Sequence, residues 1–178
     1  MHLIHAATEL GPGKACVAIG MFDGVHLGHQ QVIRQALGDA SRHEARAVVI
    51  TFDRHPNAVV APERVPPMIY TPPQKLRAIA ALGVDTTLVL RFDEALSRLS
   101  GEEFVRGLSD GFGRIVSICV GSTFTFGHRR AGNVALLQSA GNNSFSTQTA
   151  FRNLTEWKPE LEFVNCRKGN TNRIVSYV

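Results

Sequence analysis

The sequence is poor in the residues that build metal sites. Of its 178 residues only three are cysteines, Cys16, Cys119 and Cys166, and they lie far apart with no C-x-x-C pair. A zinc site built on cysteine pairs is therefore not expected, and we assign no metal ligands. Cys16 and Cys119 lie in apolar stretches, where cysteine packs as a small hydrophobic residue. Free thiols favour a reducing compartment, so we predict a cytoplasmic protein.

Long apolar runs and stacking residues are also scarce. No apolar run approaches the roughly 18 residues of a transmembrane helix, and the first residues do not resemble a signal peptide. The chain has two Tyr and one Trp, and its Lys and Arg occur singly or in short pairs such as Arg129 and Arg130. The formal net charge of +4 is therefore spread along the chain. We expect neither a membrane nor a nucleic-acid partner, and composition leaves the oligomeric state open.

Strand-like apolar runs alternate with segments of helical spacing. We predict strands over residues 16–21, 47–52, 86–92 and 115–120, and helices over residues 28–46, 72–82, 101–111 and 133–139. Ser100, with Glu103 three residues on, is the expected cap of the third helix. The alternation predicts an α/β fold with a doubly wound, mostly parallel sheet and helices on both faces. The pattern changes from about residue 140, with one further strand expected over residues 161–166.

The loops that follow strands carry the most informative residues, because ligands in such folds bind at the carboxyl ends of the strands. In the first loop Gly24 permits close approach of the backbone to a ligand, and a helix begins directly after it. The N-terminus of that helix suits phosphate, and His26 and His29, three apart, would face the same way and add donors that can carry positive charge. Two alternatives stay open: histidines that only cap the helix or are solvated, and an H-x-x-H zinc site.

Of the two further loops, only the third points by itself to a ligand. Residues 51–56 could be a purely structural turn, because a strand end followed by x-Pro is a common turn, and a role for Phe52 and Pro56 at a ligand depends on a family resemblance. Residues 121–130 mix Phe124 and Phe126 with an arginine pair, a combination that fits an aromatic phosphate compound. The alternative for the third loop is a solvated arginine pair beside two core phenylalanines.

These three loops together resemble a known family. Residues 20–29, G-M-F-D-G-V-H-L-G-H, resemble the G-x-F-D-G-x-H-x-G-H signature of the FMN adenylyltransferase module in bacterial bifunctional riboflavin kinase/FAD synthetases. Residues 51–56, T-F-D-R-H-P, are similar to the second motif of that family, and residues 120–134 resemble its third. The resemblance covers residues 1–137, with the three motifs in the order that the family has.

The resemblance implies a Rossmann-like fold of the H-x-G-H nucleotidyltransferase type, and the reaction of FMN with ATP to give FAD and pyrophosphate, with Mg²⁺. His26 and His29 would be the catalytic residues that hold the ATP phosphates. The implied ATP site is completed by the residues of the nucleotide-binding turn: Gly20, Phe22, Asp23, Gly24 and Gly28. The implied FMN site consists of residues from the second and third loops: Phe52, Pro56, Thr123, Phe126 and Arg129.

The sequence departs from the family's pattern in two places. Thr123 stands where the family usually has Asn or Asp, and its hydroxyl offers fewer hydrogen-bonding groups. The Ser-Ser-Thr-Arg-Ile-Arg-like motif that helps bind the ATP phosphates has only a degenerate counterpart over residues 170–175. Arg173 would then contact ATP; the alternative is a chance similarity.

We therefore predict an FMN adenylyltransferase-like domain over residues 1–139 and a divergent segment over residues 140–178. No residues remain for the riboflavin kinase module that normally follows, so we expect no riboflavin kinase activity. Two other functions stay open. One is a truncated or diverged remnant that binds nucleotide or flavin without catalysis, and the other is a related nucleotidyltransferase with another acceptor.

Overall fold

A computed structural model of the chain describes residues 1–144 and residues 150–153. Their strands form one six-stranded sheet in the order β1-β4-β3-β2-β5-β6, and every pairing is parallel. The strands are β1 (His2–Ile4), β2 (Gly13–Ile19), β3 (Arg46–Phe52), β4 (Thr86–Leu90), β5 (Gly113–Val120) and β6 (Ala150–Asn153). The predicted doubly wound parallel sheet is therefore confirmed.

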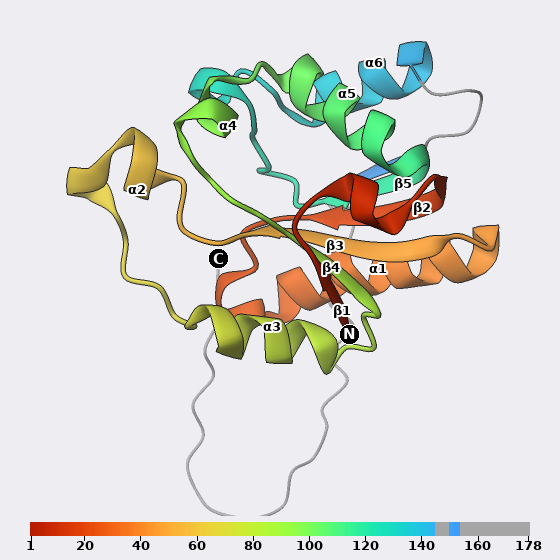
Figure 1. Ribbon diagram of the computed structural model, residues 1–178, viewed down its shortest axis with the longest axis horizontal. Helices are drawn as coiled ribbons and strands as arrows, with labels where there is room; N and C mark the ends of the chain where they lie inside the picture. Colours follow the sequence, from red (N-terminus) through yellow and green to blue (C-terminus); the bar gives the residue numbers. More distant parts are fainter. Residues whose placement is uncertain (145–149, 154–178) are drawn as a thin grey trace, which may run out of the picture.

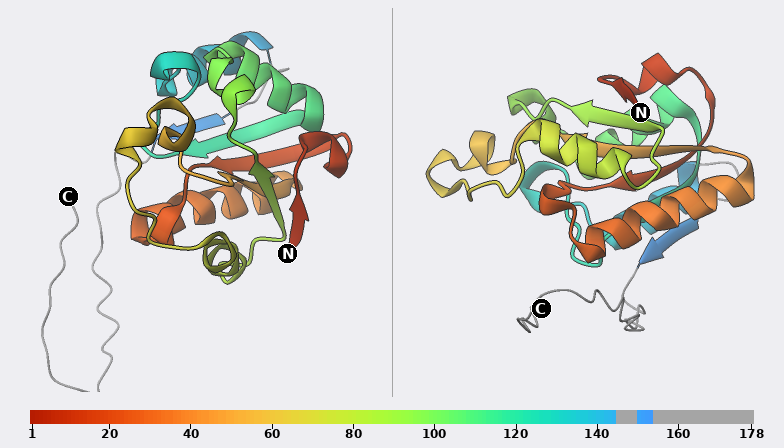
Figure 2. Two further views of the ribbon diagram at one scale, coloured as in Figure 1. Left: turned by 60° about the vertical axis from the view of Figure 1, so that its left-hand side comes forward. Right: turned by 90° about the horizontal axis from the view of Figure 1, so that it is seen from below.

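Helices cover both faces of this sheet, as Figures 1 and 2 show. The long α1 and α3 lie on one face, and α5 and α6 lie on the other. The α-helices are α1 (Leu27–His43), α2 (Asn57–Val60), α3 (Pro72–Ala80), α4 (Glu94–Arg98), α5 (Gly101–Phe112) and α6 (Val134–Ser144). Short 3₁₀ turns are η1 (Ala7–Leu10), η2 (Asp23–Val25), η3 (Pro62–Arg64) and η4 (His128–Arg130).

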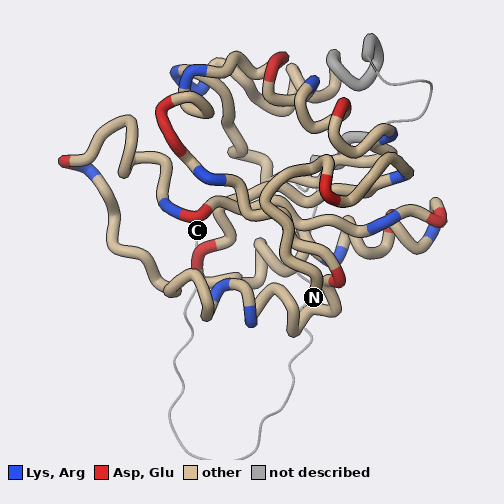
Figure 3. Tube along the Cα trace, viewed as in Figure 1, with Lys and Arg blue, Asp and Glu red and all other residues tan. Residues whose placement is uncertain are grey.

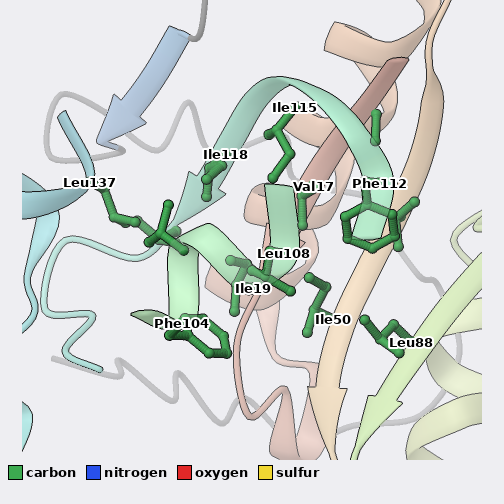
Figure 4. Close-up of a cluster of buried hydrophobic side chains, with 14 of the residues drawn as sticks. Val17, Ile19, Ile50, Leu88, Phe104, Leu108, Phe112, Ile115, Ile118 and Leu137 are labelled. Atoms are coloured by element: carbon green, nitrogen blue, oxygen red, sulfur yellow. The ribbon is translucent and has the colours of Figure 1, made fainter. Parts of the chain in front are cut away.

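The core is split between the two faces because side chains of a strand alternate in direction. On β2, Val17 and Ile19 pack with the side chains of α5, whereas Ala18 packs with those of α1 and α3. Figure 4 shows the α5 side of this core, with Phe104 and Phe112 packed against the sheet. Both faces of β2 are thus covered, which makes it a central strand as predicted.

The strand order places a switch point between β2 and β5. The chain runs outward from β2 to β3 and β4, then returns across the sheet to add β5 on the other side of β2. The loops that follow β2 and β5 therefore diverge from neighbouring strands at the carboxyl edge of the sheet. Crevices for ligands form at such points in open α/β sheets.

Several boundaries differ from the prediction. The strand predicted over residues 16–21 ends at Ile19, because the chain is already turning at Gly20. β1 and α4 were not predicted, since segments of three and five residues are too short to show a period. The Ser100 capping box of α5 is confirmed, with the Ser100 hydroxyl accepting from the Glu103 N–H at 3.1 Å.

The C-terminal part of the described chain extends beyond the predicted first domain. α6 continues to Ser144, past the predicted boundary at residue 139, since the polar residues at its end conceal the helical period. β6 then pairs with β5 in the same sheet. The division into residues 1–139 and 140–178 stays a prediction, and the strand predicted over residues 161–166 lies outside the described residues. Within the described ranges no helix is long and apolar enough to cross a membrane.

Candidate active site

The first loop leaves β2 through a tight turn in an unusual backbone conformation. Phe22, Gly24 and Val25 have φ values of 49°, 72° and 39°. Positive φ suits glycine but is strained for a branched residue such as valine. Both Phe22 and Val25 are buried, at 1% and 5% exposure, so packing holds the turn in place. Strain that surrounding packing maintains is typical of functional turns.

The turn delivers two histidines to the start of α1. His26 is the N-cap residue, and its Nδ1 accepts a hydrogen bond of 3.4 Å from the main-chain N–H of His29. The two rings stack with centroids 3.6 Å apart and an interplanar angle of 25°. Gly28 leaves room for the His26 ring, because a Cβ atom at this position would lie in tight contact with it, at 3.3 Å. The prediction that His26 and His29 face the same way is confirmed.

The two histidines are not electrostatically equivalent. Burial, and to a lesser extent the neighbouring His26, lowers the pKa of His29 to about 4, while Asp23 offsets part of the shift. The His29 ring is therefore neutral at pH 7 in this structure, although an N–H of a neutral imidazole still donates a hydrogen bond. The sequence predicted that both histidines can carry positive charge; in the structure His29 is an uncharged donor.

A cavity of about 380 Å³ opens between this motif and the loop after β5. We call it the histidine cavity; residues 19–22, 26, 28–29, 31–32 and 121–124 line it. Five residues of the predicted ATP site are among them: Gly20, Phe22, His26, Gly28 and His29. The first turn of α1 also faces this region, and its Leu27 and Gly28 N–H groups make no hydrogen bond among the described residues.

Asp23 and Gly24, also predicted for the ATP site, do not line the histidine cavity. The Asp23 carboxylate instead accepts hydrogen bonds from the main-chain N–H groups of Ile69 and Tyr70, at 2.8 and 2.9 Å. Burial raises the pKa of Asp23, but these N–H groups and that of Gly24 outweigh burial, and the pKa lies below its usual range. Asp23 thus fastens the segment before α3 to the first loop. Arg173, the remaining predicted ATP contact, lies outside the described residues.

A second, larger cavity of about 740 Å³ adjoins the first. We call it the aromatic cavity; residues 21, 52, 55–57, 60, 92, 96–97, 104 and 123–130 line it. All five residues predicted for the FMN site are among them: Phe52, Pro56, Thr123, Phe126 and Arg129. The second and third loops thus converge here, although about seventy residues separate them in sequence.

Aromatic rings form much of this wall. Phe52 and Phe92 meet edge to face with centroids 5.8 Å apart, and Phe124 stacks on Phe126 at 5.5 Å. Phe126 also packs against Phe104 from α5, at 5.9 Å. Each of the two interpretations of the third loop describes part of it. Phe126 is only 9% exposed, as expected for a core phenylalanine beside a solvated arginine pair. Phe126 also lines the aromatic cavity, as the ligand-binding prediction requires.

The cationic end of the aromatic cavity is the turn η4. Arg129 and Arg130 are exposed, and both have positive φ, 53° and 58°. The neighbouring His128 is fixed by its Nδ1, which lies 3.1 Å from the main-chain oxygen of Ser97. Figure 3 shows that elsewhere on the described trace Lys and Arg are interspersed with Asp and Glu. The two arginines therefore give this cavity a local positive rim.

The two cavities share a border formed by Met21, Thr123 and Phe124, which line both. Thr123 is the position where the sequence departs from the family's usual Asn or Asp. A ligand in one cavity would therefore meet a ligand in the other beside this residue. Among the described residues no three His, Cys, Asp or Glu side chains gather in a way that could hold a metal ion.

Sequence reasoning missed several residues of this region. Phe92 follows β4 at the carboxyl edge of the sheet, so the rule that had selected the other loops could have found it. Lys75 of α3 was also missed, although it is only 2% exposed. It lies four residues before the buried Ile79, so a lysine on the apolar face of a predicted helix was the available signal.

Comparisons with known proteins agree with this geometry. The sequence model of the FAD synthetase family matches residues 10–158. The chain is 34% identical over 144 residues to a bifunctional riboflavin kinase/FMN adenylyltransferase of Escherichia coli K12, covering 79% of this chain and 46% of that protein. It is 37% identical over 154 residues to a Pseudomonas fluorescens protein of the same name, covering 84% of this chain and 49% of that protein.

A solved structure titled as a macrolide-efflux protein from Streptococcus pneumoniae is similar in fold, with a TM-score of 0.69 and 23% sequence identity. That match covers 86% of this chain and 50% of the solved one, and at this identity it supports the fold alone. The chain spans about half the length of the curated relatives that it matches. The three motifs, the parallel sheet and the family match over residues 10–158 agree, and the chain belongs to the FAD synthetase family.

Proposed function

We propose that the chain is an FMN adenylyltransferase, which transfers the AMP group of ATP to FMN and releases pyrophosphate. The observation that carries the proposal is the pair of adjoining cavities, one with two histidines and beside a helix N-terminus, the other aromatic with an arginine rim. The names of the matched relatives support the same reaction.

In this proposal ATP binds in the histidine cavity with its phosphates at the start of α1. The N–H groups of Leu27 and Gly28, which have no hydrogen-bond partner within the described part of the chain, and the positive end of the helix dipole suit phosphate oxygens. His26 and His29 add side-chain donors in the same place, and a phosphate beside His29 would raise the pKa of its ring. These groups stabilise charge that grows during transfer, which is where such donors have the greatest effect.

FMN binds in the aromatic cavity, whose volume of about 740 Å³ is in the usual range for small-molecule sites. Phe52 and Phe126 provide apolar walls for the flavin ring, and Arg129 provides positive charge at the rim. The FMN phosphate then lies toward the border at Thr123.

The reaction takes place at that border. An oxygen of the FMN phosphate forms a bond to the α-phosphorus of ATP, and the bond from that phosphorus to the bridging oxygen of the β-phosphate breaks. Pyrophosphate leaves with the electron pair of the broken bond. The protein contributes position and charge stabilisation, with no covalent intermediate on the chain.

Mg²⁺ is proposed as the companion of ATP. The described residues provide no cluster of three ligating side chains, which suits an ion held mainly by substrate phosphates. A cytosolic location is proposed on the free, buried thiols of Cys16 and Cys119.

The direct test is incubation of the purified chain with FMN, ATP and Mg²⁺, with FAD measured by chromatography and pyrophosphate by a coupled assay. We expect FAD and pyrophosphate in equal amounts, and no adenylylated product when phosphopantetheine replaces FMN. Binding of both ligands without any product would instead indicate a noncatalytic remnant. Adenylylation of phosphopantetheine without FAD formation would contradict the choice of acceptor.

A further inference from the structure

A buried lysine lies directly behind the candidate site. Lys75, in the first half of α3, is 2% exposed, and its Nζ donates hydrogen bonds to the main-chain oxygens of Phe52, at 2.8 Å, and Met21, at 3.3 Å. Phe52 is the last residue of β3 and Met21 lies two residues beyond the end of the neighbouring β2, so the two oxygens lie where the second and first loops begin. Lys75 lines neither cavity.

Such a residue is costly for the fold. Burial of an ammonium group is unfavourable unless the group is paired and hydrogen-bonded. Among the described residues no carboxylate forms an ion pair with Lys75. Burial lowers the pKa of Lys75, and the more distant carboxylates of Asp23 and Asp53 oppose that shift. One of these carboxylates belongs to the first loop and the other to the second, so each loop contributes one negative charge that favours the charged form of Lys75.

The oxygens that Lys75 holds are close to where the substrates would meet. Met21 lines both cavities, and Phe52 lines the aromatic cavity. The hydroxyl of Thr51 donates a second hydrogen bond, of 3.0 Å, to the same oxygen of Met21. Two donors from different elements thus fix one main-chain group at the border.

The same stretch of chain is fastened to the first loop at another point. Asp23 accepts hydrogen bonds from the N–H groups of Ile69 and Tyr70, immediately before α3 begins. The contact between Asp23 and this segment therefore orients α3, and α3 in turn presents Lys75 to Met21 and Phe52. The arrangement joins the first loop, the second loop and α3 into one unit.

We propose that Lys75 is a positioning residue that fixes the first and second loops relative to each other, so that the phosphate of FMN and the α-phosphorus of ATP meet at the border formed by Met21. The inference rests on the proposed adenylyltransferase function and assigns a role to a residue outside both cavities. The rate of transfer is sensitive to displacements of about 1 Å between the reacting atoms. Loss of the Lys75 hydrogen bonds should therefore affect turnover more than the binding of either substrate alone.

The experiment compares Lys75→Met, which keeps the length of the side chain, with Arg46→Met. Arg46 is the matched control, because its guanidinium also donates to two main-chain oxygens, those of Leu10 and Gly11, but at the amino end of β3. Thr51→Val is a milder third variant that removes only the second donor to Met21. For each variant we measure thermal unfolding, the Kd of FMN alone, the Kd of a non-hydrolysable ATP analogue alone, and kcat for FAD formation.

For Lys75→Met we expect kcat to fall by about 10- to 100-fold while each Kd changes by less than about threefold. Thr51→Val should show a smaller fall of the same kind, and Arg46→Met should retain its kcat even where its unfolding temperature is lowered. If Lys75→Met does not fold, Thr51→Val compared with Arg46→Met answers the same question. If the wild-type chain forms FAD and the Lys75 or Thr51 variant has the same kcat as the Arg46 control, this inference alone is overturned. If the wild-type chain forms no FAD, the proposed function is overturned as well.

Discussion

The two cavities at the carboxyl edge of the sheet are built in different ways. Most of the histidine cavity is built by one contiguous motif, in which β2 leads through a strained turn into α1, and the loop after β5 forms its other side. The aromatic cavity is assembled from segments that follow β3, β4 and β5, together with Phe104 of α5. A contiguous motif fixes its own geometry, whereas an assembled wall depends on the packing of the whole sheet.

This difference predicts how each region responds to mutation. Substitution of the two histidines in the histidine cavity should affect the chemical step while leaving the fold intact. Side chains in the aromatic cavity should affect flavin affinity, and some of them also the stability of the fold. The following variants test that separation.

The largest effect is expected from the histidines. His26→Ala and His29→Ala each remove a donor aimed at the transferring phosphate, and one such donor is typically worth about 2.7–4 kcal/mol, or 100- to 1000-fold in kcat. FMN affinity should change little. His43→Ala, at the exposed end of α1, is the control that should behave as wild type. Unchanged turnover in both cavity variants would exclude the proposed role of the motif.

Arg173 tests whether the histidine cavity is completed by a residue outside the described structure. If residues 170–175 replace the family's phosphate-binding motif, Arg173→Ala should weaken ATP binding by roughly 1.5–3 kcal/mol, the range for a hydrogen bond to a charged group. Titration with a non-hydrolysable ATP analogue measures it, with Arg167→Ala as the matched tail variant. Equal affinity in the two variants would show that the tail motif is a chance similarity.

Phe52→Ala tests the other side of the comparison. It removes one apolar wall and the ring contact with Phe92, so FMN binding should weaken by about 2 kcal/mol while binding of the ATP analogue is unchanged. Phe52→Leu, which keeps most of the apolar volume, should lose much less. Fluorescence titration with FMN gives both values, and an equal loss of ATP affinity would mean that the cavities are not separate.

The smallest effect is expected at Asp23, which is placed to support the site from outside the cavity. Asp23→Asn removes a carboxylate that holds two N–H groups and should lower the free energy of unfolding at pH 7 by about 1–2 kcal/mol. Because the folded-state pKa of Asp23 is below its usual value, its stabilising effect is complete above that usual value and is lost as pH falls through the lowered pKa. Urea unfolding should therefore show a difference between wild type and variant that shrinks in acid. A difference that persists in acid would contradict the assigned role.

The sequence predicted the contiguous region better than the assembled one. The spacing of His26 and His29 in a turn before a helix was enough to predict that their rings would face the same way, because helix geometry is local. The convergence of Phe52 with Phe126 was implied by the family resemblance, and it agrees with the rule that strand ends share an edge. Phe104, in the first turn of α5, escaped prediction because a helical period does not reveal which neighbour or cavity a side chain meets.

Asp23 shows a different limit. The motif predicted it for the nucleotide, but its carboxylate is bonded to a segment more than forty residues further on. Lys75, the residue behind both loops, gave only the weak signal of a lysine on an apolar helix face. Tertiary partners of polar side chains are set by the three-dimensional arrangement of the loops, and spacing along the chain carries little information about them.

The central claim is that two separate cavities hold two substrates at once. Calorimetric titration of FMN into the chain already saturated with an ATP analogue whose α–β bridge cannot be cleaved tests it most directly. The account predicts that one FMN binds per chain in the presence of one bound nucleotide, with phosphates close enough for reaction when ATP replaces the analogue. Mutually exclusive binding, in which the nucleotide abolishes the FMN isotherm by direct competition, would contradict it.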